Sequence, residues 1–73
     1  MERLKKLRLE RKVKQVQLAR AIGLTQQAIS LYENNLREPD LKTLTKIADF
    51  FGVSVDYLLG RTDTNNFEKN RYQ

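Results

Sequence analysis

Residues 15–34 decide the fold, and they read QVQLARAIGLTQQAISLYEN. The apolar side chains that recur at helical spacing in this stretch are Leu18, Ala19, Ile22, Ile29 and Tyr32. Gly23 permits a tight turn between the two apolar runs, and Thr25 can accept hydrogen bonds from the free N–H groups of the next helix. The stretch therefore predicts two short helices, near residues 15–22 and 26–34, joined at a tight corner.

Helical signals continue on both sides of this pair. Residues 2–11 predict a first helix with Leu4 and Leu7 pointing inward. After the pair, Asn35 tolerates the left-handed conformation of a helix end, and Pro39 blocks any continuation.

Two further helices are expected between residues 40 and 60. Asp40 and Ser54 are suitable N-terminal caps, and Gly52 and Gly60 are suitable ends. The apolar residues at helical spacing are Leu41, Leu44, Ile47, Ala48 and Phe51 in the first and Val55, Leu58 and Leu59 in the second. Because no run alternates apolar and polar residues, we expect an all-α, compact five-helix domain over residues 1–60. The polar tail over residues 61–73 is open to three interpretations: a linker, a sixth helix or a frayed end.

Composition narrows the function classes. The chain has 73 residues with no Cys and no His, which removes thiol nucleophiles, imidazole bases and the usual zinc ligands. It also has no carboxylate pair, phosphate-cradling glycine loop or nucleophile–base set. We therefore expect no enzyme, no metal, no cofactor and no small-molecule substrate. The apolar runs fall far short of the roughly 20 residues that span a bilayer, so a cytoplasmic protein without a membrane partner is expected.

Positive charge is concentrated at the start of the chain. The net charge is +5, and residues 1–14 hold seven basic side chains against two acidic ones. The basic residues are Arg3, Lys5, Lys6, Arg8, Arg11, Lys12 and Lys14. A basic end favours a polyanionic partner, since each cation beside a phosphate releases condensed counterions, although a solvated helix face is the alternative.

The helix over residues 26–34 has an unusual exposed face. Ala28, Ile29 and Tyr32 share the side that must face the core. The opposite side carries Gln26, Gln27, Ser30, Leu31 and Asn34. None of these is charged, in a chain that is 32% charged. Glutamine amides can pair with adenine edges, serine can donate or accept, and leucine can contact a thymine methyl group, so the face is suited to base edges. An ordinary polar surface is the alternative interpretation.

The stretch over residues 15–34 resembles the helix-turn-helix of the lambda-type phage repressor and Cro family, also called the xenobiotic response element family. The residues that carry the resemblance are Leu18, Ala19, Ile22, Gly23, Leu24, Ile29, Tyr32, Glu33 and Asn34. The similarity extends over residues 3–60, including Leu7-Arg8, Pro39-Asp40-Leu41 and Gly52-Val53-Ser54-Val55. It departs at Lys14, where the family usually has a Ser or Thr cap. The start of the second helix is therefore expected either to be weakly fixed or to offer a cation to a phosphate.

The resemblance implies sequence-specific binding of double-stranded DNA by a transcriptional regulator, a repressor of phage or mobile-element type. It implies that the bases are read in the major groove by Gln26, Gln27, Ser30 and Leu31. It assigns the backbone phosphates to Gln15, Thr25, Asn34 and Arg37. Leu31 stands where the family often has a polar or basic residue. The family also pairs an Arg with a Glu at the positions of Arg8 and Glu33, a structural ion pair that orients the reading helix.

A domain of this size reads only about 4 to 6 base pairs through one helix, so we expect a homodimer on a two-fold symmetric operator. The fifth helix and the residues after it are the expected dimer surface, because Val55, Leu58 and Leu59 exceed what one short helix can easily bury; the alternative is that all three face the core of the monomer. The alternative function is a protein-interaction module, such as an antitoxin or anti-repressor partner with the same fold. Interface cores are enriched in aromatic residues, Met and Arg. The uncharged face of residues 26–34 exposes none of these, which argues against that module.

Overall fold

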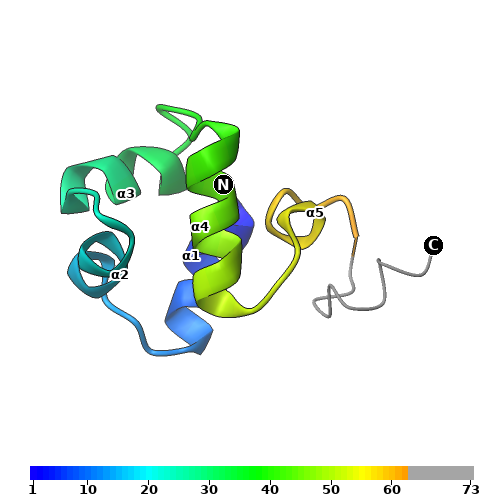
Figure 1. Cartoon of the computed structure of the whole chain (residues 1–73), viewed down its shortest axis with the longest axis horizontal. Helices are drawn as coiled ribbons and strands as arrows, with labels where there is room; N and C mark the ends of the chain where they lie inside the picture. Colours follow the sequence, from blue (N-terminus) through cyan, green and yellow to red (C-terminus); the bar gives the residue numbers. More distant parts are fainter. Residues whose placement is uncertain (63–73) are drawn as a thin grey trace.

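Five helices form the part of the chain that the computed structural model describes, residues 1–62 (Figure 1). Their bounds are α1 Glu2–Glu10, α2 Gln15–Ile22, α3 Gln26–Glu33, α4 Leu41–Phe51 and α5 Val55–Leu58. Helices α2 and α3 lie together at one end, α1 and α4 lie in the middle, and α5 lies at the other end. The expected all-α, five-helix fold is confirmed, with no strand in residues 1–62. The expected tail lies outside the described residues from residue 63 onward.

The expected caps fix where three of the helices begin. The side chains of Thr25, Asp40 and Ser54 each accept a hydrogen bond from the backbone N–H three residues later, at 3.1, 2.8 and 2.9 Å. The side-chain hydrogen bond from Thr43, together with the one from its backbone N–H, lowers the pKa of Asp40 from its ordinary value. Each cap satisfies a donor that the first turn of a helix leaves free, so these ends are set by local chemistry.

The start of α2 is fixed differently from the expectation. Lys14 supplies no side-chain cap, but the Oε1 atom of Gln17 accepts a hydrogen bond from the Lys14 backbone N–H at 2.8 Å. This is one half of a capping box, in which the third residue of the helix reaches back to the residue before it. The expectation of a weakly fixed start therefore has to be corrected.

Helix ends differ from the expected ones by a single residue. Arg11 and Asn34 are the C-terminal caps of α1 and α3 rather than their last helical residues. Asn35 then adopts the expected left-handed conformation, with φ of 61°. The chain direction thus changes directly after α3.

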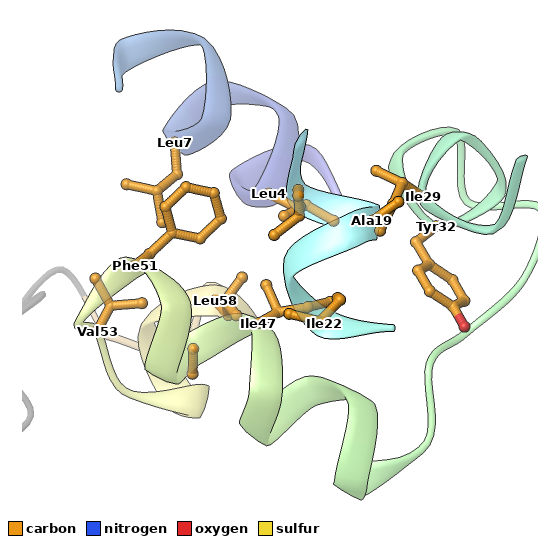
Figure 2. Packing of buried hydrophobic residues seen from close by; sticks show 12 residues of the cluster. Leu4, Leu7, Ala19, Ile22, Ile29, Tyr32, Ile47, Phe51, Val53 and Leu58 are labelled. Carbon is orange, nitrogen blue, oxygen red and sulfur yellow. The ribbon is translucent and has the colours of Figure 1, made fainter. Parts of the chain in front are cut away.

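The core gathers apolar side chains from every helix (Figure 2). Its buried members are Leu4, Leu7, Leu18, Ala19, Ile22, Ile29, Tyr32, Ile47, Ala48, Phe51, Val53 and Leu58. Figure 2 shows Leu7 of α1 and Phe51 of α4 in one part of this cluster, and Ile22 of α2 and Ile47 of α4 in another. Burying a side chain of this size stabilises the fold by roughly 1.5–3 kcal/mol, so these contacts hold the helix-turn-helix pair on the rest of the domain.

Two leucines expected on apolar stripes are not buried. Leu41 is 71% exposed and Leu59 is 42% exposed. Burial increases along α4, from Leu41 through the half-buried Leu44 to the fully buried Ile47. The first turn of α4 therefore projects past the core, which explains why helical spacing alone assigned Leu41 wrongly. No helix within residues 1–62 has the length and apolar character needed to cross a bilayer.

Candidate nucleic-acid interface

The exposed face of α3 is built on a buried one. Ile29 is fully buried and Tyr32 is 7% exposed, so these residues fix how the helix is rotated against the core. On the opposite side, Gln26, Gln27 and Asn34 are exposed, whereas Ser30 and Leu31 are half-buried. The structure therefore brings the four proposed base-reading residues onto one uncharged surface, with the two glutamines at the N-terminal end.

The turn between α2 and α3 positions that N-terminal end. Gly23 is left-handed, with φ of 76°, and the Leu24 N–H donates to the Ala19 carbonyl at 2.8 Å. Thr25 is extended, and its Oγ1 atom accepts from the Ala28 N–H at 3.1 Å. A β-carbon at Gly23 would meet no neighbouring atom, so glycine is required there by the backbone conformation and not by lack of space.

A buried ion pair joins α1 to the C-terminal end of α3. The Nε atom of Arg8 lies 2.5 Å from Oε2 of Glu33, and its Nη2 atom lies 3.1 Å from Oε1. The remaining Nη1 group donates to the Val13 carbonyl at 2.8 Å. Arg8 and Glu33 are only 8% and 6% exposed. The planar guanidinium thus grips the carboxylate with two parallel hydrogen bonds, an arrangement that a lysine cannot reproduce.

Gln15 connects this ion pair to the reading face. Its Nε2 atom donates to Oε1 of Glu33 at 3.0 Å, and its Oε1 atom accepts from Nε2 of Gln26 at 3.3 Å. The sequence indicated that Gln15 points toward α3, but no pattern in the sequence indicated its hydrogen bond to Glu33. A continuous series of hydrogen bonds therefore runs from Arg8 to Gln26 and restricts the orientation of the Gln26 amide.

Hydrogen bonds from Asn34 and from Met1 hold the C-terminal end of α3. The Nδ2 atom of Asn34 donates to the Ser30 carbonyl at 2.9 Å and approaches the Ser30 hydroxyl at 3.4 Å. The Met1 backbone nitrogen donates to the Tyr32 carbonyl at 3.0 Å and also to Oδ1 of Asn35. The sequence did not indicate this contact, since Met1 and Asn35 are far apart in the chain.

Arg37 lies apart from the other proposed phosphate ligands. It is exposed in the segment between α3 and α4 and lines an open hollow together with Met1, Leu44 and Leu59. Thr25 and Gln15, by contrast, lie at the N-terminal ends of α3 and α2. The proposed phosphate ligands therefore stand at both ends of α3. In residues 1–62, no three His, Cys, Asp or Glu side chains are grouped closely enough to hold a metal ion.

Comparison with known proteins identifies the family. The helix-turn-helix family matches residues 4–58. The chain is similar to the SPbeta prophage-derived uncharacterized HTH-type transcriptional regulator YonR of Bacillus subtilis (strain 168), at 48% identity over 61 residues, 84% of this chain and 56% of the relative. It is also similar to the uncharacterized HTH-type transcriptional regulator YqaE of the same strain, at 47% identity over 58 residues, 80% of this chain and 50% of the relative.

A third relative is the cryptic phage CTXphi transcriptional repressor RstR of Vibrio cholerae, at 34% identity over 67 residues, 92% of this chain and 60% of the relative. The chain thus spans between 50% and 60% of the length of these three relatives. None of the solved structures compared with the chain matches it. The resemblance to phage-type regulators is confirmed by these names and by the family match. Because that match includes both helices of the motif and most of the core, the chain belongs to the helix-turn-helix family.

Proposed function

We propose that the chain binds double-stranded DNA in a sequence-specific manner, as the DNA-reading domain of a transcriptional repressor of phage or mobile-element type. The observation that carries this proposal is the uncharged exposed face of α3, held in a fixed orientation by the Arg8–Glu33 ion pair and by Gln15. A fixed polar face of this kind is suited to base edges in the major groove. The names of the relatives, which are regulators and repressors, support the same assignment.

In this proposal, the DNA-contacting residues on and around α3 divide into two roles. Gln26, Gln27, Ser30 and Leu31 read bases. The phosphates are held by Gln15, Thr25, Asn34 and Arg37. Gln26 reads its base with an amide that Gln15 already orients, so less rotational freedom is lost on binding. Leu31 is half-buried, which leaves part of its side chain to contact a thymine methyl group.

The proposal includes a homodimer on a two-fold operator. One helix reads too few base pairs to select a site in a genome, and a second copy doubles the number. The surface around α5 supports pairing, because Leu59 is 42% exposed and Val55 is half-buried beside it. The proposal further includes the absence of catalytic activity and a cytoplasmic localisation.

A protein-interaction module with the same fold is the second candidate. The exposed face of α3 offers no aromatic residue, Met or Arg, which are the side chains that enrich interface cores. Titration against duplex DNA at increasing salt concentration separates the two functions. A DNA-binding domain should bind a preferred duplex more tightly than a shuffled one and lose affinity as salt rises. An interaction module should not distinguish the two duplexes, because its basic residues alone give only sequence-independent, salt-sensitive binding.

Gln27→Ala and Gln15→Ala are expected to have different binding profiles. Gln27→Ala should relax base preference at one position of each half-site and cost about 1–3 kcal/mol on the best site. Gln15→Ala should weaken binding to all sequences, because phosphate contacts position the protein without specifying a base. Since Gln15 also orients the Gln26 amide, any loss of base preference in this variant should appear at the base that Gln26 reads and not at the base that Gln27 reads. The measurement is the affinity of each variant for every single-base variant of the best site. Identical profiles for the two variants would show that the roles are assigned wrongly.

A further inference from the structure

An open hollow lies between α1 and the C-terminal end of α3. It is lined by Lys5, Lys6, Leu9, Glu33, Asn34 and Asn35. None of the phosphate contacts proposed above involves α1. The hollow nevertheless shares Asn34 with the exposed face of α3, so it is continuous with the proposed DNA-reading surface.

The hollow has a net positive charge. Lys5 and Lys6 are both exposed, and neither ammonium group forms an ion pair within residues 1–62. Glu33 is the one acidic residue among those that line it. Its carboxylate already accepts hydrogen bonds from Arg8 and Gln15, and Arg8 neutralises its charge. The two lysines therefore determine the charge that an incoming group meets.

The location of the hollow at the C-terminal end of α3 indicates which part of a DNA duplex would lie beside it. A recognition helix contacts base edges mainly through its N-terminal residues, which here are Gln26 and Gln27. The C-terminal end of such a helix is directed toward the edge of the major groove, where the phosphate backbone runs. Asn34 and Asn35 are exposed at this end, but the Asn34 amide nitrogen already donates to Ser30. The ammonium groups of Lys5 and Lys6 are therefore the main donors here that are suited to phosphate oxygens.

We propose that this hollow seats a backbone phosphate flanking each half-site, with Lys5 and Lys6 as its cationic ligands. This inference rests on the proposed DNA-binding function and adds α1 to the DNA-contacting surface. It also accounts for part of the positive charge concentrated in residues 1–14. The contact adds affinity and fixes the position of the protein on the duplex without specifying a base, since Lys5 and Lys6 belong to α1 and not to α3.

The test compares salt dependence in two doubly substituted variants, on a duplex selected by the wild-type protein. Lys5→Gln with Lys6→Gln removes the two charges of the hollow. Arg20→Gln with Lys46→Gln removes two charges from another hollow, between α2 and α4, which no residue of α3 lines. The slope of log affinity against log salt should become shallower by about 1 to 2 in the first variant, since each phosphate contact contributes about 0.9. In the control variant, the slope should change by less than half of that amount.

Two further measurements make the result specific. Lys5→Arg with Lys6→Arg should restore the wild-type slope, and the preference for the selected duplex over single-base variants should be the same in all of these proteins. Flanking phosphates can also be replaced one at a time with uncharged methylphosphonates. The wild-type protein should lose affinity a few-fold at one position per half-site, the range of an exposed ion pair, and the Lys5, Lys6 glutamine variant should lose no more there.

The outcomes separate this inference from the function on which it rests. Two outcomes would overturn the proposed phosphate site while leaving DNA binding intact. One is an equal slope of log affinity against log salt in the two glutamine variants. The other is a methylphosphonate scan in which, at every position, the loss of affinity adds to the loss caused by the lysine substitutions. If the wild-type protein prefers no duplex at all, the proposed function itself fails. Thermal unfolding followed by circular dichroism checks that the variants are folded, and the methylphosphonate scan of the wild-type protein remains decisive if one of them is not.

Discussion

Glu33→Ala is expected to lower the free energy of unfolding by about 3 kcal/mol, which is the lower end of the range found when one partner of a buried ion pair is removed. The substitution leaves the guanidinium of Arg8 almost buried, with the Val13 carbonyl as its remaining hydrogen-bond acceptor. For a domain of this size, about 3 kcal/mol is a large part of the total stability, which is of the order of 0.05–0.15 kcal/mol per residue. Urea unfolding followed by circular dichroism measures the change.

The double variant identifies the pair as the cause. Arg8→Ala with Glu33→Ala should cost less than the sum of the two single substitutions, because removing both partners leaves no buried charge unpaired. Asp56 and Arg61 provide a matched control, since their side chains are 3.9 Å apart but 57% and 73% exposed. Their single substitutions should change stability by less than about 1 kcal/mol. Strict additivity for Arg8 and Glu33 would contradict the pairing.

Insertion of five base pairs between the half-sites is expected to abolish cooperative binding. Half-site centres about 10 base pairs apart, or roughly 34 Å, put both reading helices on one side of the duplex. Five more base pairs rotate one half-site to the far side, so a rigid dimer can engage only one of them. Affinity should then fall by roughly 10²–10⁴, the usual gain from binding two linked sites.

The control for this experiment places the same five base pairs outside the operator, where they should have no effect. Gel-shift titration over a range of protein concentrations gives both the affinity and its cooperativity. Unchanged affinity after the internal insertion would mean that the protein binds as independent monomers, and the homodimer would have to be abandoned.

The features that could be predicted from the sequence are local ones. Thr25, Asp40 and Ser54 cap helices because each side chain reaches a backbone N–H only three residues away. Gly23 turns the chain for an equally local reason, its left-handed backbone. The core face of α3 follows from helical periodicity alone, which is why Ile29 and Tyr32 were assigned correctly.

The features that could not be predicted depend on which segments meet in space. Helical spacing cannot tell that Leu41 lies on a turn projecting past the core. The hydrogen bond from Gln15 to Glu33 joins residues 18 positions apart, and it depends on the rotation of α2 against α3. Likewise, the hollow between α1 and α3 brings together Lys5 and Asn34, which are far apart in the sequence.

The central claim, sequence-specific reading of DNA by α3, is tested most directly by selecting bound duplexes from a random pool. The wild-type protein is predicted to enrich two inverted half-sites of about 4 to 6 base pairs, with centres about 10 base pairs apart. Selection with Gln27→Ala is predicted to return the same spacing with one base position per half-site relaxed. A pool that shows no enriched sequence after repeated rounds with the folded wild-type protein would contradict the claim.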